Sequence, residues 1–275
     1  MITNSIIELI VIVFLIIIQS IFGVGLLLFG TPSLLILGYD FANTINILMP
    51  VSISISLMQF FRSKISERKF IREYNLFCLP FLIIFLFLAL KFNYILDFKF
   101  LVGLLLVFSS ILILNKSKFS SFREIFFKLK KFVLVGIGCI HGLTNMGGSF
   151  LAIYSTLVSS NKKELARYYI CYGYLIMGVF QYLIVLFFDY KNLEFNKLFY
   201  ILLALIIYFP AQKLFKNIND KKFSKYINII ALLYGISILI TYFYTGFKFL
   251  SIGFSSIGKW TTVAKIDKAI AMYQA

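Results

Sequence analysis

Residues 138–160, "GCIHGLTNMGGSFLAIYSTLVSS", interrupt an apolar stretch where a continuous membrane helix would be expected. They contain four glycines, an asparagine, several hydroxyl side chains and His141, the one histidine of the chain. Irregular backbone survives at membrane depth only where protein or a water-filled cavity surrounds it, because lipid cannot satisfy its polar groups. These residues therefore predict a break in the helix that faces the interior of the protein.

The composition around this stretch is that of an integral membrane protein. Of the 275 residues, 61% are hydrophobic and 14% are charged, which leaves too few polar groups to cover a soluble domain. A net charge of +16 would suit nucleic acid, but the basic residues lie in short loops between apolar runs. That distribution is typical of cytoplasmic loops, so we predict a lipid bilayer and no nucleic acid as the partner.

No motif for metal, redox or catalytic chemistry is recognisable. Cys78, Cys139 and Cys171 lie inside apolar runs, at spacings that match no metal or redox motif. An HExxH motif, a pair of acids and a Walker-type loop are all missing from the sequence. Glu8 and Lys91 lie near segment ends, where snorkelling would carry their charges to the interface. We therefore predict no enzyme activity, no cofactor and no metal site.

Eight apolar segments divide the chain, and about 20 residues are needed to cross a hydrocarbon core of roughly 30 Å. Six have ordinary spanning length or slightly less. The other two are unusually long, are broken by glycines near the middle, and each opens one half of the chain. In transporters such a duplicated broken segment points to the substrate site. The segments are 5–37, 42–61, 76–96, 100–115, 132–158, 168–188, 198–212 and 226–246.

The distribution of lysine and arginine predicts how the two long segments enter the membrane. If each crosses once, the two sides carry nearly equal numbers of basic loop residues. If each returns to the side it came from, 19 basic residues fall inside and 4 outside, the tail excluded, as the positive-inside rule requires. A re-entrant hairpin and two short crossings both fit, and the short arms 132–143 and 147–158 favour a hairpin that stops near mid-membrane.

The predicted fold is an all-α polytopic membrane protein of two inverted four-segment repeats, each opening with a broken or re-entrant helix. A returning segment and three crossings give an odd number of net crossings, so the second half is inverted relative to the first. The first repeat covers 1–115 and the second 132–246. Residues 116–131 form a basic cytoplasmic linker, and 247–275 form a C-terminal tail whose lysines would lie outside.

Glycines are the predicted turns of both broken segments, because glycine reaches positive φ without strain and lets helices approach closely. A half-helix that starts inside the membrane points its free N–H groups at whatever lies beyond it. Those groups act like about half a positive charge, which suits an anion. The predicted turn glycines are Gly23, Gly25 and Gly30 in the first half and Gly142, Gly147 and Gly148 in the second.

The two predicted half-helix starts supply the candidate ligands. One start falls near Gly148 and Ser149. The other falls near Thr31, as N-cap, with Pro32 at the first helical position. We expect the two tips to meet near mid-membrane. The predicted substrate-binding residues are Thr31, Ser33, His141, Thr144, Asn145 and Ser149.

Several of these residues also have a purely structural interpretation. Gly138 and Gly142 could serve helix packing alone, and Asn145 could simply bond a neighbouring helix. His141 could be a satisfied core histidine, which is the commoner role for a lone histidine. It could instead donate to an anion or titrate in proton-coupled transport.

Two glycine motifs resemble those of the TauE/SafE sulfite exporter family, also called toluene-sulfonate uptake permeases. In "GVGLLLFGTPSLLILG", residues 23–38, glycines and the proline fall on the family's opening motif, whereas Leu26 and Leu27 replace two of its glycines. In "HGLTNMGGSFLAIYS", residues 141–155, three glycines match the motif that opens the second half. Asn145 and Ser149 stand there at positions where the family often has glycine or proline.

The resemblance implies a multi-pass permease of a bacterial or archaeal inner membrane, for small and often sulfur-containing anions such as sulfite and organosulfonates. Together with the residue pattern, it makes a secondary permease for a small anion, working by alternating access, the leading hypothesis. Coupling to a proton or another ion stays open, as does a homo-oligomeric state. The alternatives are a non-transporting membrane subunit whose basic loops bind a partner or lipid, and a membrane-embedded enzyme.

Overall fold

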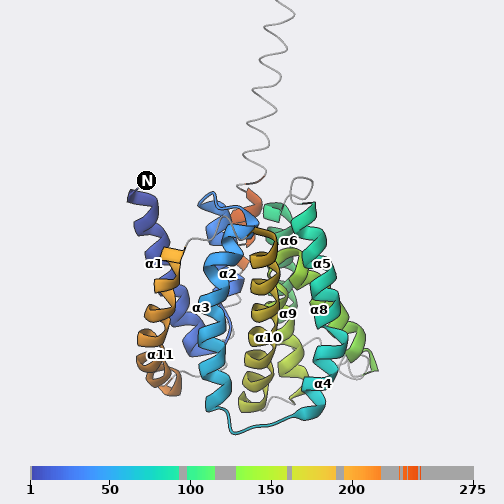
Figure 1. Cartoon of the computed structure of the whole chain (residues 1–275). Coiled ribbons are helices and arrows are strands. Elements are labelled where there is room, and N and C mark those ends of the chain that lie inside the picture. The colour runs from blue at the N-terminus through green and yellow to red at the C-terminus, as the bar shows by residue number, and fades with distance from the viewer. Residues whose placement is uncertain are drawn as a thin grey trace, which may run out of the picture.

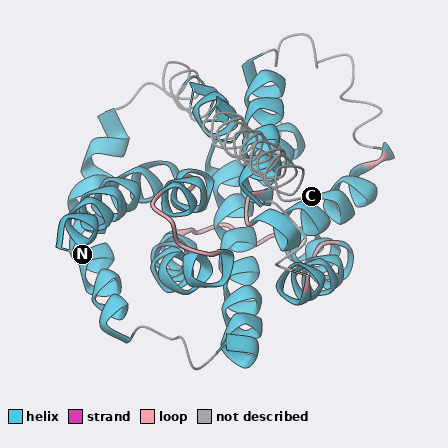
Figure 2. Ribbon diagram, turned by 90° about the horizontal axis from the view of Figure 1, so that it is seen from above, coloured by secondary structure: helices cyan, strands magenta, loops and turns pink. Residues whose placement is uncertain are grey.

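A computed structural model describes residues 2–92, 98–114, 128–159, 163–189 and 195–217, with 229, 232–233, 235–240 and 242. These residues form helices joined by short loops, and among them there is no strand (Figure 2). The predicted all-α class is therefore confirmed. Residues 116–127 of the predicted linker, the tail 247–275 and most of the predicted segment 226–246 lie outside the described residues.

Most helices of the first half follow the predicted segments, and the long first segment is divided in two, as expected (Figure 1), but the helical stretch predicted at 76–96 already begins at Arg68. A single residue, Cys78, separates the fourth helix from the fifth. The elements are α1 (Ile2–Phe22), α2 (Leu26–Ile36), α3 (Phe41–Arg62), α4 (Arg68–Phe77), α5 (Leu79–Lys91) and α6 (Phe98–Leu114).

The second half repeats this plan, because its long segment is also divided into two helices. The first of them begins at Lys130, so the last two residues of the predicted linker are helical. The described elements are α8 (Lys130–Thr144), α9 (Gly147–Val158), α10 (Lys163–Asp189), η3 (Phe195–Leu198) and α11 (Phe199–Asn217).

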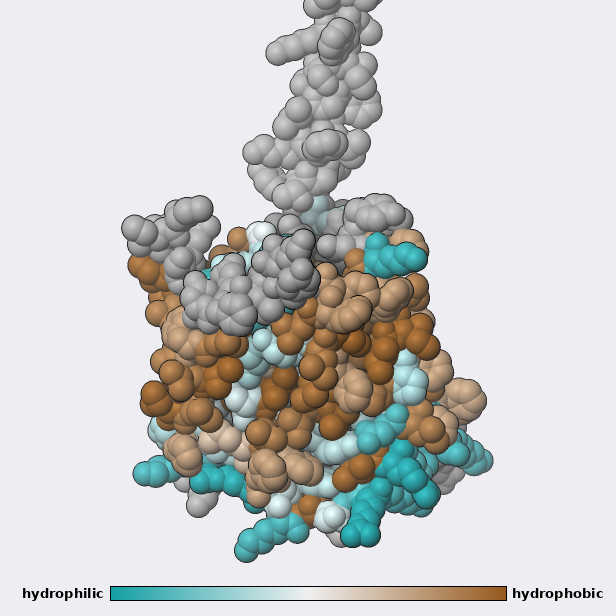
Figure 3. Space-filling model, in the orientation of Figure 1, coloured by the Kyte–Doolittle hydropathy of each residue, from teal (hydrophilic) through white to brown (hydrophobic). Residues whose placement is uncertain are grey.

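The surface and the helix lengths are those of a multi-pass membrane protein. Within the described residues, three helical stretches are long and apolar enough to cross a membrane: Phe41–Arg62, Arg68–Lys91 and Glu164–Phe188. Figure 3 shows hydrophobic residues (brown) in a broad belt around the middle of the molecule and hydrophilic residues (teal) gathered along the lower edge. This arrangement fits a bilayer around the belt, with basic loops at the lower interface.

The lengths of the broken pairs differ between the two halves. The 21 residues of α1 reach about 31 Å at 1.5 Å per residue, enough to cross the hydrocarbon core. The 15 residues of α8 and the 12 of α9 reach only about 22 Å and 18 Å. The second pair is therefore too short to cross twice, whereas the first pair combines a long arm with the short arm α2.

Polar contacts identify the end of the bundle at which each broken pair begins and finishes. The Tyr39 hydroxyl, just after α2, donates to the Glu8 carboxylate of α1 at 2.5 Å, so α2 returns to the end from which α1 came. We call this the Glu8 end. Lys130, which begins α8, binds Glu73 of α4 at 2.8 Å. We call this the Glu73 end, and it lies at the bottom of Figure 1.

The second pair also returns to the end where it begins. Tyr154, near the finish of α9, has its ring 6.4 Å from that of Phe70. Phe70 lies one turn of α4 away from Glu73, the partner of Lys130. Both outer ends of the α8–α9 pair therefore lie at the Glu73 end, opposite to those of the α1–α2 pair.

Candidate functional site

The break between α8 and α9 lies at Asn145 and Met146. Asn145 has φ of 62°, the one positive φ of a non-glycine residue in the described chain. Asparagine is among the few residues that tolerate this left-handed conformation, so it ends α8 without a glycine. The hydroxyl of Thr144 accepts from the Met146 N–H at 3.2 Å, and Ser149 Oγ donates to the Met146 carbonyl at 3.1 Å. Side chains of the break itself thus satisfy much of its backbone.

Asn145 also connects the two halves of the chain. Its Nδ2 donates to Thr31 Oγ1 of α2 at 3.0 Å, and both residues are 0% exposed. Its other amide atom, Oδ1, is buried and has no hydrogen-bond partner among the described residues. A buried polar atom without a partner is rare in native proteins, so this carbonyl oxygen marks a place where a ligand or water would fit.

Three further side chains near this break carry unpartnered polar atoms. Both ring nitrogens of His141, the Tyr174 hydroxyl and the Gln181 Oε1 are buried and lack hydrogen-bond partners within the described part of the chain. Gln181 Nε2 donates to the His141 carbonyl at 3.3 Å. A Cβ on Gly148 would lie only 1.9 Å from the Tyr174 hydroxyl, which places that hydroxyl at the first turn of α9. His141 is therefore buried, as a core histidine would be, and its ring has the Gln181 side chain as an electrostatic neighbour but no hydrogen bond of normal geometry.

Tyr174 and Gln181 were not among the predicted site residues. They lie seven residues apart on α10, which puts them on one face of that helix. The sequence does carry this weak signal, but tyrosine is so frequent in this chain that one more in an apolar segment is not distinctive. Only the packing of α10 against α9 shows that this face meets the break.

The break between α1 and α2 begins earlier than predicted. Gly23 and Gly25 have φ of 75° and 135° and form the turn as expected, but α2 begins at Leu26. Thr31 and Ser33 therefore lie inside α2, and the prediction that Thr31 caps a half-helix is wrong. The reason is that Gly25 already ends the irregular segment, and Pro32 is accommodated inside the helix, where it removes one backbone hydrogen bond.

Two of the predicted turn glycines instead serve helix packing. A Cβ on Gly30 would come within 2.8 Å of the Leu48 side chain, and one on Gly142 within 2.6 Å of the Leu82 carbonyl oxygen. Both glycines lie inside helices, Gly30 in α2 and Gly142 in α8. Their assignment to the bends is wrong, because close contact with α3 and α5 is what requires a residue without a side chain.

The two breaks do not meet tip to tip. The second break contacts Thr31, five residues into α2 and therefore about 8 Å from its start. The nearest side chains to Gly23 are instead Gln59, Arg167 and Cys171, each within 3.8 Å of a Cβ placed there. The long α1 carries the first break past the middle of the bundle, so the second break lies against the side of α2.

A second polar cluster surrounds the first break and is largely self-satisfied. Gln19 Nε2 donates to Ser52 Oγ at 3.0 Å and to Ser56 Oγ at 3.2 Å. Gln59 Nε2 donates to the Gln19 carbonyl at 2.9 Å. These bonds satisfy side chains of α1 and α3 and the Gln19 carbonyl near the end of α1, and they could not be predicted because the partners lie more than 30 positions apart. We assign this cluster a mainly structural role.

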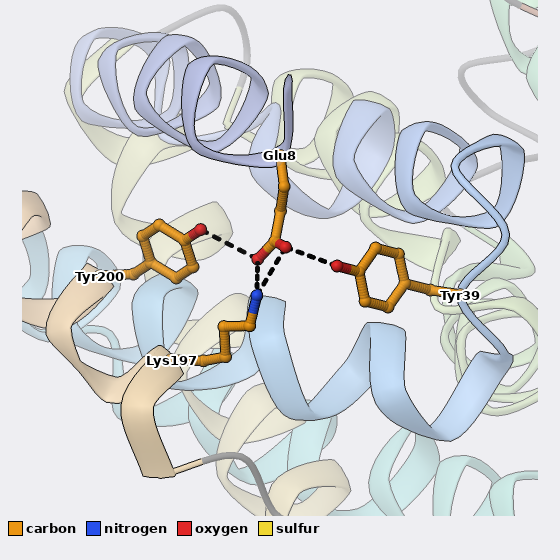
Figure 4. Close-up of polar contacts among 4 residues, drawn as sticks. All are labelled: Glu8, Tyr39, Lys197 and Tyr200. Atoms are coloured by element: carbon orange, nitrogen blue, oxygen red, sulfur yellow. Dashed lines mark hydrogen bonds and ion pairs between the residues drawn. The ribbon is translucent and has the colours of Figure 1, made fainter. Parts of the chain in front are cut away.

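Glu8 occupies a third polar cluster, at the Glu8 end (Figure 4). Its carboxylate accepts from Lys197 Nζ at 2.6 Å, from the Tyr200 hydroxyl at 2.9 Å and from Tyr39. Glu8 is 0% exposed, so the expectation that it snorkels to the interface is wrong. An ion pair inside the protein satisfies it instead, as a buried charge requires.

Comparison with known proteins gives one match. Residues 8–238 match the family model described as "Sulfite exporter TauE/SafE". This range covers all described elements from the second turn of α1 to α11, including both breaks. No curated protein and no solved structure gives a significant match to the chain.

Proposed function

The chain belongs to the sulfite exporter TauE/SafE family, and from this premise we propose that it is a secondary permease for a small anion. The family consists of membrane transporters for sulfite or related anions. Within that class we propose a sulfur-containing substrate such as sulfite or an organosulfonate. Its binding site is the contact between Asn145 and Thr31, and its membrane is the bacterial inner membrane.

The observation that carries this proposal is the concentration of unpartnered polar atoms at the second break. Buried polar groups are normally paired, yet Asn145, His141 and Tyr174 each present at least one atom without a partner in the described chain. The first-turn N–H groups of α9 add positive potential, although that of Ser149 already bonds the Met146 carbonyl at 3.3 Å. An anion there would meet the Tyr174 hydroxyl and a ring N–H of His141 as donors, together with the helix dipole and without a buried lysine, whereas the Asn145 oxygen can only accept a hydrogen bond.

We further propose that residues 1–115 and 132–246 are inverted repeats, joined by the linker 116–131 and followed by the tail 247–275. Support comes from the packing: α1 packs on α11 just as α8 packs on α5, and α3 packs along α10. A two-fold axis in the membrane plane would carry the α1–α11 pair onto the α8–α5 pair and would exchange α3 with α10. The broken pairs also begin at opposite ends, as inverted repeats require.

Sided labelling tests this architecture. In a variant whose three cysteines are replaced by serine, single cysteines at Ser117 and Ser160 should both react with an impermeant thiol reagent from the cytoplasmic side. The physical reason is that a returning α8–α9 pair leaves both flanking loops on one face of the membrane. Labelling of the two positions from opposite sides would show that α8 and α9 together cross the membrane once. That result would contradict the inverted-repeat architecture.

Ligand-induced stabilisation tests the site. Purified protein in detergent is heated with sulfite, methanesulfonate or acetate, with chloride at the same ionic strength as reference. A ligand that binds the folded state raises its stability by about 2.7 kcal/mol at 100 times its dissociation constant. We expect Tyr174→Phe to unfold at the wild-type temperature without ligand, because no hydrogen bond is lost. With ligand, its affinity should fall about tenfold, the effect of losing one bond to a charged group.

Tyr172→Phe is the matched control on the same helix. The Tyr172 hydroxyl donates to Asn75 Oδ1 at 2.9 Å, so its loss should lower stability without ligand and leave the ligand-induced rise unchanged. Equal ligand-induced rises in wild type and Tyr174→Phe would exclude the Tyr174 hydroxyl from the site. The absence of any rise with all three anions would contradict an anion site at the second break.

A further inference from the structure

Two ion pairs connect the halves of the chain, one at each end of the bundle. At the Glu8 end, Glu8 of α1 binds Lys197 of η3 at 2.6 Å. At the Glu73 end, Lys130 of α8 binds Glu73 of α4 at 2.8 Å. Among the described residues these are the two lysine–carboxylate pairs that join helices of different halves; the Glu8 pair is largely buried, and the Glu73 pair is partly buried. Their side chains are at most 26% exposed.

The two pairs are equivalent positions of the proposed inverted arrangement. Each joins the opening helix of one half, α1 or α8, to the third predicted segment of the other half, which is its second crossing. That segment is entered through η3 before α11 in one half and through α4 before α5 in the other. Exchange of the halves therefore maps Glu8 onto Lys130 and Lys197 onto Glu73, with the signs of the charges reversed.

Both pairs are formed in the same structure, and the proposed site between them is closed. Thr31, His141 and Asn145 are each 0% exposed, so neither end gives solvent access to the second break. Rocking of one half against the other would separate α1 from η3 at one end, or α8 from α4 at the other. Each movement must break the ion pair at the end that opens.

We propose that these two ion pairs are the gates of the permease, Glu8–Lys197 closing one end and Glu73–Lys130 the other. The proposal rests on the proposed function. The Glu8 gate is the stronger, because Tyr39 and Tyr200 add hydrogen bonds to its carboxylate, whereas Lys130 is the one side chain of the described residues that donates to Glu73. The end that carries Glu73 therefore opens at the lower free-energy cost.

Accessibility of a cysteine at position 149 measures which end is open, without the need for a substrate. In the cysteine-free background, Ser149→Cys is labelled with an impermeant thiol reagent from each side of oriented membrane vesicles. The pair variants are Glu8→Gln with Lys197→Gln, and Glu73→Gln with Lys130→Gln. Both residues of a pair are changed together because one charge left alone inside the protein would be strongly destabilising.

The gate proposal predicts reciprocal changes in the labelling rate. Neutralising the Glu8 pair should raise labelling from the Glu8 end at least about fivefold, the lower range of coupling between conformational states, and lower it from the Glu73 end. Neutralising the Glu73 pair should do the reverse. The exchanged pair Glu8→Lys with Lys197→Glu should restore the wild-type rates, which also demonstrates correct folding.

The outcomes separate this proposal from the proposed function. If the two neutralised variants raise labelling from the same side, or if neither changes the labelling rate, the gate proposal is contradicted. This holds even where the wild-type protein transports an anion. If the reciprocal change is found but no anion is transported, the gates stand and the permease function fails. If the exchanged pair is folded but labels like the neutral pair, attraction between the charges is not what closes that end.

Discussion

Replacing Asn145 with glycine is expected to lower anion flux at least about tenfold while the amount of folded protein in the membrane stays unchanged. Glycine keeps the left-handed backbone at the break, where φ is 62°, and removes only the side chain. The loss follows because the side-chain N–H group that now donates to Thr31 at 3.0 Å is the hydrogen-bond donor that Asn145 can offer an anion, whereas its unpartnered oxygen can only accept. A hydrogen bond that involves a charged ligand contributes about 1.5–3 kcal/mol, which corresponds to roughly tenfold or more in affinity.

Two companion variants sharpen this prediction. Asn145→Asp keeps the size and the backbone preference but adds a negative charge, so it should lower flux further by repelling an anion. Ser54→Ala is the control, because the Ser54 hydroxyl bonds the Val51 carbonyl of its own helix at 2.8 Å and should leave flux at the wild-type level. Wild-type flux in Asn145→Gly, with the protein folded, would remove Asn145 from the site. Asn145→Leu is less informative, since leucine is strained in the left-handed conformation.

Replacing Gly138 with alanine is expected to destabilise the folded protein by about 2–3 kcal/mol, the upper part of the range for an overpacked core. A Cβ there would lie 2.2 Å from the Cys78 carbonyl oxygen. Backbone cannot rotate away as a side chain can, so α8 must shift from α5. The measurement is the thermal unfolding midpoint in detergent, together with the fraction of monodisperse protein after extraction.

Gly136→Ala supplies the matched control on the same helix. No atom lies within 4 Å of a Cβ at Gly136, and alanine is a better helix former than glycine by roughly 0.5–1 kcal/mol. This variant should therefore unfold at or above the wild-type temperature. Equal midpoints for Gly138→Ala and Gly136→Ala would contradict the close backbone contact between α8 and α5.

Patterns that are local in the chain were predictable from the sequence. The two broken segments, the helical class and the second break at Asn145 follow from glycine, polar and apolar residues within a few positions of each other. The family membership, carried by the same glycine motifs, is also confirmed. The start of α2 was misplaced because Thr31 and Pro32 fit the usual helix-start pattern, whereas Gly25 had already ended the irregular segment.

Features that depend on neighbouring helices were not predictable. Gly142 suits a turn and a packing contact equally well, and only the position of Leu82 on α5 decides between them. Glu8 looks like a residue near a helix end until Lys197, 189 positions away, is placed beside it. The prediction that the two tips meet is wrong for a similar reason. The length of α1 decides how far along the bundle the first break lies.

Anion flux through the purified protein in proteoliposomes tests the central claim most directly. Vesicles are supplied with labelled sulfite, methanesulfonate or acetate, with and without a pH gradient, beside vesicles that hold Asn145→Gly or no protein. A secondary permease predicts saturable uptake of at least one sulfur-containing anion, above protein-free vesicles and reduced at least about tenfold in the variant. Uptake no faster than in protein-free vesicles for every anion, with folded wild-type protein, would contradict it and favour a non-transporting membrane subunit.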